Sequence, residues 1–353
     1  MRTRFGVIGY GYMGHVHVEK LLKMKELDVI AVCDNDPDKL LDTPDGIKRY
    51  SNMEDLLHDE EINTVIVAVP NHIHLEAVTK AAHAGKHILC EKPVAMSVHE
   101  LDQMVKVTKE CGVKFTVHHQ RRWDKDFRTA KEVFDQQLTG SVYTIQSKLF
   151  GFNGNMHDWH IYNQFGGGML YDWGVHLIDQ MLFMVNSRIK SVYADVRNVI
   201  NDEVDDYFKI ILRFENGIIG EIELGTYFLS DKEGWFERHW FIGGNQGSMY
   251  SDGFHPTGKI VRTTRLLTNV PGKTTMTASG PTRSFGPPTP GLIVTEDLPE
   301  VDTDQMMFFT NFVKAMNEEE EFVVKIPEVR RVLLLMDAIR QSAVTGRSVD
   351  FEL

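Results

Sequence analysis

The glycine-rich segment Gly9-Tyr10-Gly11-Tyr12-Met13-Gly14 restricts the fold more than any other part of the sequence. It directly follows an apolar run and precedes a stretch with helical spacing. In this setting the first glycine permits a tight turn, the second lets the backbone approach a pyrophosphate, and the third lets the helix pack closely on the strand. The backbone N–H groups of Tyr12 and Met13 would then face the phosphates at a helix N-terminus. The segment therefore predicts a strand, a turn and a helix that together bind a dinucleotide.

The acidic residue Asp34 ends the next apolar run, 20 residues beyond Gly14 (34 − 14). A carboxylate at this position bonds the ribose hydroxyls of NAD, and it would repel the 2′-phosphate of NADP. The spacing therefore favours NAD as the cofactor over NADP. The alternative is a glycine-rich turn in some other α/β protein, but such a turn requires neither the helix nor the acid in this register.

The N-terminal part of the chain alternates short apolar runs with helical patterns. Five of these runs are continuous rather than alternating, as strands covered on both faces should be. They are Phe5–Ile8, Val29–Cys33, Thr64–Val69, His87–Cys90 and Phe115–Val117. Capping boxes at Ser51–Glu54 and Ser97–Glu100 indicate helix starts, and Gly85 and Gly112 indicate helix ends. The alternation predicts an α/β domain over residues 1–120, with a doubly wound parallel sheet of the Rossmann type.

The pattern changes after residue 120. Long strands are predicted at Ser141–Phe150, Ser191–Val199, Asp205–Phe214 and Ile218–Phe228. Glu215-Asn216-Gly217 would join the last two as a hairpin turn. Helices are predicted at Leu170–Met184, Asp304–Met316 and Ile326–Thr345. Residues 121–353 are therefore expected to form an α+β domain with a largely antiparallel open sheet, which binds substrate and supports oligomerisation.

Residues 252–300 are rich in Gly, Pro and Thr, which is typical of a long loop or arm. A compact monomer seldom keeps a loop of this length, so we expect the arm to pack on a partner subunit or over the active site. The open face of a sheet is also commonly buried against another subunit. A homodimer or a homotetramer is therefore expected.

Bulk composition excludes several classes of partner. The 353 residues carry a formal net charge of −12, which disfavours binding to nucleic acid. No apolar stretch reaches the length of about 18 residues that a membrane-spanning helix needs. The cysteines Cys33, Cys90 and Cys111 form no CxxC pair, which suits free thiols in a reducing cytoplasm. We therefore expect a cytoplasmic protein that acts on a small molecule.

Polar residues follow two of the predicted parallel strands, and ligands bind at the carboxyl ends of such strands. Val69-Pro70-Asn71, with His74 soon after, ends one strand, and Cys90-Glu91-Lys92-Pro93 ends the next. A lysine directly after a buried strand could donate a hydrogen bond to a substrate oxygen. The alternative is a solvated lysine at a strand end, which is a common arrangement.

Asp172 and His176 follow Gly166-Gly167-Gly168, and their spacing of four places both on one face of a helix. The neighbouring residues Val175, Leu177, Ile178 and Met181 suit a buried helix, so a carboxylate and an imidazole buried there would need partners. A histidine with a pKa of about 6.5 is a natural proton acceptor for alcohol oxidation. One alternative is an ion pair on the helix surface. Another is a catalytic metal held by Asp172, His176 and a further histidine, but no HExxH motif or Cys/His cluster supports it, and no metal is expected.

Taken together, these segments resemble the Gfo/Idh/MocA family of sugar and cyclitol oxidoreductases over nearly the whole chain. The segments are the Gly9–Gly14 loop, Val32-Cys33-Asp34, Val69-Pro70-Asn71 with His74, Glu91-Lys92-Pro93, and Gly167-Gly168 through Asp172 to His176. The resemblance implies that Lys92, Asp172 and His176 form the catalytic constellation, with a cis Lys92–Pro93 bond that helps to aim the lysine. It also implies a set of cofactor contacts, which are Pro70, Asn71, His74, Glu91, Lys92 and Gln120.

Two further segments are candidates for substrate recognition. Arg122 and Trp123 follow the last predicted Rossmann strand, where the chain crosses to the second domain, and they could grip hydroxyls and stack on a sugar. Asn153, Trp159 and Tyr162 belong to a loop in which polar and aromatic groups alternate, as carbohydrate recognition requires. The alternatives are a charged domain linker and an exposed loop. The aromatic loop also opens the prospect of a larger glycoside as the substrate, rather than a free monosaccharide or inositol.

The sequence therefore predicts hydride transfer between NAD and a secondary alcohol or ketone of a sugar, cyclitol or glycoside. His176 would take the hydroxyl proton, Lys92 would bond the same oxygen, and Asp172 would hold the substrate or the lysine. Which of Lys92 and His176 is the base stays open. The alternatives are a non-catalytic NAD sensor and a glycoside-processing enzyme that recycles a tightly bound NAD, although a sensor need not retain all three residues.

Overall fold

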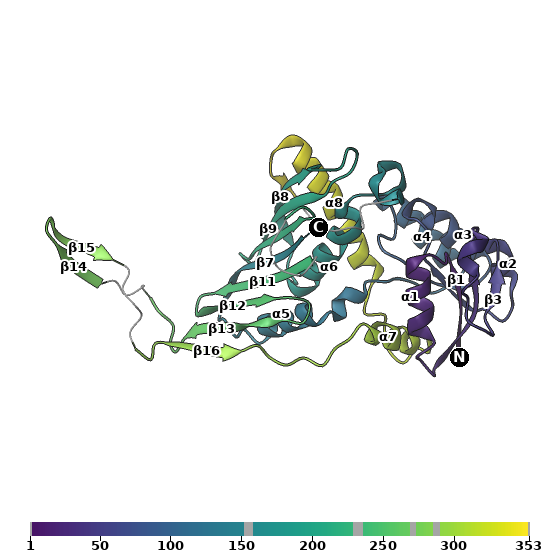
Figure 1. The fold of residues 1–353 in the computed structure, drawn as a ribbon, viewed down its shortest axis with the longest axis horizontal. Coiled ribbons are helices and arrows are strands. Elements are labelled where there is room, and N and C mark those ends of the chain that lie inside the picture. The colour runs from purple at the N-terminus through teal and green to yellow at the C-terminus, as the bar shows by residue number, and fades with distance from the viewer. Residues whose placement is uncertain (1, 152–157, 229–235, 269–272, 285–289, 352–353) are drawn as a thin grey trace.

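The chain forms two sheets with helices packed against each (Figure 1). The computed structural model describes residues 2–151, 158–228, 236–268, 273–284 and 290–351. The N-terminal part forms one sheet, and most of the remaining chain forms a larger one. This is the predicted combination of an α/β Rossmann domain and an α+β domain.

The first sheet has six parallel strands in the order β3-β2-β1-β4-β5-β6. The strands are β1 (Thr3–Ile8), β2 (Leu27–Cys33), β3 (Lys48–Tyr50), β4 (Thr64–Val67), β5 (His87–Cys90) and β6 (Phe115–Val117). This order is the doubly wound order of dinucleotide-binding domains, and it confirms the predicted parallel sheet. Only β3 was not predicted, because it is a short, charged edge strand without an apolar run.

Four α-helices connect these strands, namely α1 (Tyr12–Leu21), α2 (Met53–His58), α3 (His74–His83) and α4 (Val98–Glu110). Ser97 caps α4 as predicted, since its hydroxyl accepts from the N–H of Glu100. The predicted cap at Ser51 is wrong by one position, because the Asn52 side chain accepts from the N–H of Asp55 instead. Gly85 and Gly112 follow α3 and α4 with φ of 70° and 68°, the left-handed conformation expected just after a helix.

The second sheet has nine strands in the order β16-β13-β12-β11-β7-β10-β9-β8-β17. They are β7 (Val142–Gly151), β8 (Ile189–Arg197), β9 (Tyr207–Phe214), β10 (Ile219–Gly225), β11 (Phe236–Gly244), β12 (Gly247–Asp252), β13 (Thr257–Thr263), β16 (Ile293–Asp297) and β17 (Val349–Asp350). All neighbouring pairs are antiparallel except β7 with β10, which are parallel. The largely antiparallel sheet is thus confirmed, as is the hairpin that joins β9 and β10.

Three helices cover one face of this sheet, namely α5 (Lys125–Asp135), α6 (Val175–Met184) and α8 (Ile326–Thr345) (Figure 1). The other face carries partly exposed charged side chains, among them Lys148, Lys209, Glu221 and Glu223, which form ion pairs with one another. A homodimer or homotetramer that uses this face stays a prediction. Among the helices that the structure describes, none is both long and apolar enough to cross a membrane.

The predicted arm is divided between the sheet and a separate hairpin. Within residues 252–300, β13 and β16 belong to the main sheet, so the prediction of one long loop is wrong there. The hairpin of β14 (Lys273–Thr277) and β15 (Gly280–Ser284) projects from the end of the molecule that lies away from the first domain (Figure 1). The hairpin therefore does not cover the active site of its own chain, and its packing on a partner subunit stays a prediction.

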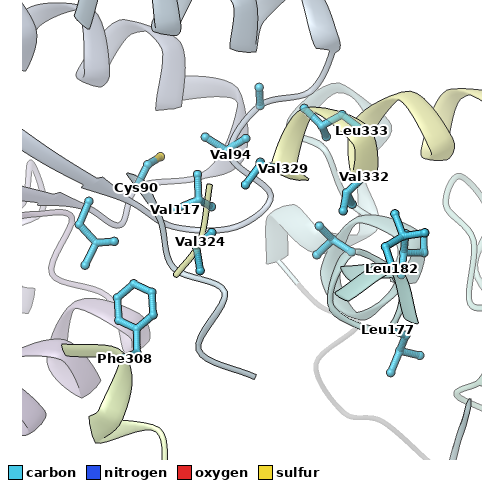
Figure 2. Packing of buried hydrophobic residues seen from close by; sticks show 14 of the residues in the cluster. Cys90, Val94, Val117, Leu177, Leu182, Phe308, Val324, Val329, Val332 and Leu333 are labelled. Carbon is cyan, nitrogen blue, oxygen red and sulfur yellow. The ribbon is translucent and has the colours of Figure 1, made fainter. Parts of the chain in front are cut away.

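The C-terminal part of the chain returns to the first domain through α7 (Met306–Met316). Phe308 and Phe309 of α7 contact the ring of His118, and the hydroxyl of Thr116 donates to the carbonyl oxygen of Val324. Figure 2 shows side chains of both domains in one buried cluster, with Val94 and Val117 from the first domain and Val324 and Val329 from the C-terminal segment. The division at residue 120 therefore describes the two sheets but not the packing of α7.

A buried ion pair ties α5 to the second sheet. The side chains of Arg238 and Asp126 are both 1% exposed, with Arg238 Nε 2.9 Å from Asp126 Oδ2. The same carboxylate oxygen accepts from Trp240 Nε1 at 2.8 Å. Removal of one partner from such a pair leaves an uncompensated buried charge, which is much more costly than the loss of an exposed pair.

We expect Asp126→Ala to lower the free energy of unfolding of the second domain by about 3–5 kcal/mol, because it leaves the buried Arg238 guanidinium without its carboxylate partner. Urea titration followed by tryptophan fluorescence measures this loss. The matched control is Glu19→Ala, which breaks the exposed pair of Lys23 and Glu19 and should cost no more than about 1 kcal/mol. Equal losses in the two variants would contradict the argument.

Candidate active site

An ion pair between the two domains forms the centre of the site. Lys92 is the second residue after β5, and its Nζ lies 2.7 Å from Asp172 Oδ1 and 2.9 Å from the Asp172 carbonyl oxygen. The side chains are 15% and 22% exposed, so the pair is sheltered but reachable. The Lys92–Pro93 bond is cis, as the resemblance implies. Sequence reasoning thus placed Lys92 and Asp172 correctly beside each other, although they are 80 residues apart.

Asp172 lies in a single π-helical turn, Leu170–Gly174, that leads into α6. Such turns occur often at functional sites, because they re-aim the side chains of a helix. The hydroxyl of Tyr171 in this turn donates to the carbonyl oxygen of Met96 at 2.8 Å, which links the turn to the first domain. The predicted helix Leu170–Met184 is therefore confirmed, with a widened first turn.

The charge state of Asp172 is fixed by Lys92. Burial alone would raise the pKa of Asp172, but the charge and hydrogen bond of Lys92 outweigh burial and hold this pKa below its usual value. The charges of His160 and Arg121 act in the same direction. Asp172 is therefore a carboxylate at neutral pH, and it can orient the ammonium group of Lys92.

His176 is a neutral, buried imidazole. It is 3% exposed, and its Nδ1 has no hydrogen-bond partner among the residues described. Burial lowers its pKa well below the usual value, and the nearby cations Lys92 and Arg121 lower it further. The ring is therefore unprotonated at neutral pH, which is the state that a general base needs, and its burial also makes it a weaker base than a free imidazole.

The glycine loop has the shape of a pyrophosphate cradle. A Cβ atom at Gly9 would lie 2.4 Å from the carbonyl oxygen of Ala68, and one at Gly14 would lie 2.2 Å from the carbonyl oxygen of Gly9. At Gly11, by contrast, a Cβ would meet no atom within 4 Å. Gly9 and Gly14 are thus required by the fold, whereas Gly11 opens space above the N-terminus of α1, next to Tyr12 and Met13. The loop fits a dinucleotide, and its N–H groups would bind the phosphates.

Asp34 lies at the end of β2, where its carboxylate supports the loop. Oδ2 accepts from the N–H of Tyr10 at 2.9 Å, and Oδ1 accepts from the N–H of Asp36 at 3.0 Å. Each oxygen keeps one lone pair for a ribose hydroxyl. The predicted contact with the cofactor is thus compatible with the geometry, and it stays a prediction.

Three side chains that were predicted to contact the cofactor have partners within the protein instead. Asn71 Nδ2 donates to the carbonyl oxygen of Gly166 at 2.9 Å. The fully buried ring of His74 lies between the carbonyl oxygens of Val69 and Pro93, at 2.9 and 3.0 Å. These contacts tie the turn after β4 to the glycine turn of the second domain and to the turn that carries Lys92. Asn71 and His74 therefore both position the site. Both ring nitrogens of His74 are bonded to backbone oxygens, so its side chain does not contact the cofactor, whereas a contact from Asn71 Oδ1 stays a prediction.

Glu91, the third of these, is the centre of a buried triad. Its Oε1 accepts from His17 Nε2 at 2.6 Å and from His118 Nδ1 at 2.7 Å, and its Oε2 accepts from the N–H of Lys92. Within the described part of the chain, these three residues are the one group whose spacing could suit a metal ion. The carboxylate oxygen already occupies the space between the two rings as a hydrogen-bond acceptor. The triad therefore holds α1, β5 and β6 together beside Lys92. It gives no support to the alternative of a catalytic metal bound by Asp172 and His176.

Pro70 and Gln120 remain candidates for cofactor contacts. Pro70 is half-buried at the end of the β4 turn. Gln120 is 6% exposed, and its Oε1 has no hydrogen-bond partner among the described residues. A buried amide oxygen without a partner is costly, so a ligand group that donates to Gln120 would stabilise the site.

Arg122 and Trp123 do not face the site, which corrects the prediction that they bind substrate. The guanidinium of Arg122 is held by Asp179 at 2.6 and 2.8 Å and by Glu328 at 2.7 Å, and its side chain is 1% exposed. Trp123 is 6% exposed and packs edge-on against Phe308. Both residues join the domains, and the guanidinium of Arg122 is already occupied by two carboxylates.

The aromatic loop is described only in part. Asn153 lies outside the described residues. The ring of Trp159 stacks on His160 with centroids 3.8 Å apart, and Tyr162 is 41% exposed beside Phe165. His160 also acts on the pKa of Asp172, so this loop borders the catalytic pair. Trp159 and Tyr162 therefore stay candidates for substrate contacts.

Sequence reasoning missed two residues beside the site. The guanidinium of Arg121 lies 3.9 Å above the ring of Trp173 and is close enough to lower the pKa values of Asp172 and His176. His119 is 1% exposed, and its ring stands edge-on to His176 with centroids 6.1 Å apart. Adjacent arginines in a tight 3₁₀ turn point in different directions, so the sequence alone did not show which one faces the site. The carboxylate of Asp179 on α6, which needs a buried cation, was the available signal for Arg122.

Comparison with known proteins gives a consistent result for both domains. Residues 3–119 match a family described as "Oxidoreductase family, NAD-binding Rossmann fold", and residues 127–250 match the "GFO/IDH/MocA C-terminal domain". An NAD-binding protein from Listeria innocua has a similar structure, with a TM-score of 0.85 and 35% sequence identity over 99% of this chain and 97% of that one.

Two curated relatives are more distant. Myo-inositol 2-dehydrogenase of Thermotoga maritima is 25% identical over 266 residues, which are 73% of this chain and 78% of the relative. The 2,7-anhydro-N-acetylneuraminate hydratase of Escherichia coli is 27% identical over 265 residues, 72% of this chain and 69% of the relative. At this level of identity, neither relative identifies the substrate of this chain.

The buried triad predicts how stability depends on pH. Burial lowers the pKa of His118 to about 4, so the unfolded chain, with a value near 6.5, binds a proton more readily than the folded protein. The resulting stability is complete above pH 6.5 and is lost as the pH falls toward 4. Glu91 acts in the same direction at lower pH, because its pKa is held well below 4.5.

We expect His118→Asn to lose part of the pH dependence that the unmodified protein shows between pH 7 and pH 5, by about 2 kcal/mol. Asparagine keeps a donor for Glu91 but does not titrate. Urea unfolding at the two pH values measures the difference. The control is His58→Asn, which replaces an exposed histidine outside the triad. An unaltered pH dependence in His118→Asn would show that other groups carry it.

Proposed function

Because the chain belongs to the Gfo/Idh/MocA family of oxidoreductases, we propose that it transfers hydride between NAD and a secondary alcohol or ketone of a sugar, cyclitol or glycoside. The observation that carries this proposal is the approach of Lys92, ionised Asp172 and neutral His176 at the carboxyl ends of the parallel strands. A cation and a proton acceptor side by side are what alcohol oxidation requires. A non-catalytic sensor would have no use for this arrangement.

The chemistry divides among the residues as follows. The bound nicotinamide supplies the hydride acceptor. His176 takes the hydroxyl proton of the substrate, since its ring is neutral and has Nδ1 free of a partner among the described residues. Lys92 donates one N–H to Oδ1 of Asp172 and one to the carbonyl oxygen of Asp172. It keeps its third N–H for the substrate oxygen, whose developing negative charge it stabilises. Asp172 fixes the direction of that third N–H.

The aromatic and polar surroundings support a carbohydrate substrate. Trp173, which carries the Arg121 guanidinium on its ring, and Trp159, which stacks on His160, lie near the catalytic pair. Sugar and cyclitol rings offer C–H faces and hydroxyl edges, and both kinds of surface are matched here. The inositol dehydrogenase of Thermotoga maritima among the relatives supports the same class.

A second candidate is net non-redox chemistry on a glycoside, with NAD retained and restored within each turnover. The hydratase of Escherichia coli among the relatives favours it, because that name describes a reaction without net oxidation. The same residues would serve, since His176 and Lys92 act on the oxygen in either direction of hydride transfer. Cofactor that stays with the protein through gel filtration would support this candidate.

We expect purified protein with NAD to raise the NADH absorbance when one class in a panel of inositols, aldoses and glycosides is added. Lys92→Met should lower kcat for that substrate by roughly 10²–10³-fold, as loss of an oxyanion-stabilising donor does, while calorimetry still detects NAD binding. The control is Lys106→Met, which removes an exposed cation from α4. Near-normal turnover in Lys92→Met would refute the assignment. Silence across the whole panel, with NAD bound, would shift weight to the second candidate.

We also propose NAD rather than NADP as the natural cofactor, since the carboxylate of Asp34 would oppose a 2′-phosphate. Asp34→Asn keeps an acceptor for the N–H of Tyr10 but removes the charge. The ratio of kcat/KM for NADP to that for NAD should rise roughly tenfold, about the effect of one unit charge at a sheltered site. Asp38→Asn, a nearby exposed carboxylate, is the control. Equal effects in both variants would point to overall charge instead.

A further inference from the structure

The proposed reaction does not explain why glycines precede the catalytic turn, but close contacts with the backbone at Gly167 and Gly168 do. At Gly168, φ is 98°, and a Cβ atom would lie 2.4 Å from Asp205 Oδ1. At Gly167, a Cβ would lie 2.3 Å from the carbonyl oxygen of His160. Gly167 thus allows the backbone of His160 to approach, and Gly168 allows a carboxylate from a distant part of the chain to approach the backbone. That carboxylate belongs to Asp205, just before β9.

Asp205 contacts the start of the catalytic turn twice. Its carbonyl oxygen accepts from the N–H of Met169 at 2.9 Å, and its Oδ2 accepts from the N–H of Leu170 at 2.7 Å. The first N–H groups of a helix have no acceptor within the helix, and a neighbouring side chain usually caps them. No local side chain caps this turn, because Met169 stands at the N-cap position. Asp205 therefore supplies the missing cap from the second sheet.

We propose that Asp205 is a positioning residue for the catalytic turn, and that its carboxylate holds Asp172 and His176 in register with Lys92. The contact at Leu170 is two residues from Asp172, so a shift of the first turn changes the distance between Asp172 and Lys92 directly. This inference rests on the proposed function for its catalytic consequence, but its structural part does not depend on the substrate.

The charged groups around Asp205 make this contact sensitive to pH. Arg340 of α8 favours the ionised carboxylate, whereas burial and the neighbouring Asp206 of the same loop favour the protonated form. Burial prevails and raises the pKa of Asp205 to about 6. A hydrogen bond to a carboxylate is about twice as strong as one to a neutral acceptor. The cap is therefore strong above pH 6 and weaker below it.

Arg340 has a second carboxylate nearby, which provides a matched control. Its Nη1 lies 3.5 Å from Asp337 Oδ1, and its guanidinium stacks 4.2 Å from the ring of Tyr171. Asp337→Asn removes one negative charge from the surroundings of Arg340 without a direct contact to Met169 or Leu170. Asp205→Asn removes the same charge from the cap and keeps an oxygen acceptor of the same size.

The first measurement is hydrogen exchange of peptides that cover residues 168–176, at pH 7 and without substrate. Asp205→Asn should exchange faster than the unmodified protein by roughly fivefold, because a neutral amide oxygen is a weaker acceptor than a carboxylate, and Asp337→Asn should not. In the unmodified protein, protection of the same peptides should fall between pH 7.5 and pH 5, after correction for intrinsic exchange, by more than protection of peptides from β9 and β10, since the loss of stability expected from His118 affects both sets. This second comparison needs no variant, so it remains available if Asp205→Asn does not fold.

The second measurement is the pH profile of kcat with the substrate found in the panel. The unmodified protein and Asp337→Asn should lose activity below a pH of about 6, the pKa of Asp205. Asp205→Asn should have a kcat lowered roughly tenfold at pH 7, since small misplacements in an active site are costly. Its affinity for NAD should be unchanged, and its kcat should show no further fall as the pH drops below about 6. Unchanged exchange, or a persistent acid limb in Asp205→Asn, would overturn the proposal. If no substrate is found, the exchange data alone decide it, so its failure is distinct from failure of the proposed function.

Discussion

The ion pair between Lys92 and Asp172 joins the two domains at the place where chemistry is proposed. Lys92 belongs to the parallel sheet that holds the cofactor, and Asp172 belongs to the helix that underlies the second sheet. Almost every other contact of the site supports one side of this pair. The triad of His17, Glu91 and His118 fixes the lysine turn from below, and Tyr171 ties the aspartate turn to Met96. A cation and an anion that meet across a domain boundary need such support, because each would be costly to leave unpaired.

The architecture of the first domain was predictable because its constraints are local. A tight turn, a close helix and an acid at the end of β2 each require particular residues at a fixed spacing, and Gly9, Gly14 and Asp34 meet these requirements. Four strands of the second domain, β7 to β10, were also predictable, whereas β11, β12 and β17 were not predicted, and neither were the strands within the part of the chain that is rich in Gly, Pro and Thr. There β13 and β16 pair with the sheet through backbone hydrogen bonds, for which the side chains give little signal.

The direction of polar side chains was much less predictable than their place in the chain. Arg122 was expected to reach a ligand and is enclosed by Asp179 and Glu328, whereas its neighbour Arg121 faces the site. His74 and Asn71 occupy the right strand end but bond to backbone carbonyls. In each case the deciding partner lies far away in the sequence. A buried polar group must satisfy its hydrogen bonds, and only the three-dimensional structure shows which distant group does so.

The return of α7 to the first domain has a consequence for how the protein folds during synthesis. Strands β1 to β6 leave the ribosome first, yet Phe5 packs against Phe312, and Lys114 donates to the carbonyl oxygens of Ala315 and Met316. The part of the N-terminal domain that contacts α7 is therefore covered only after the C-terminal segment has been synthesised. During that interval Phe5 and Lys114 lack these partners, and transiently exposed apolar surface of this kind is prone to aggregation. The first domain, although it is synthesised first, thus reaches its final packing only when the last part of the chain is available.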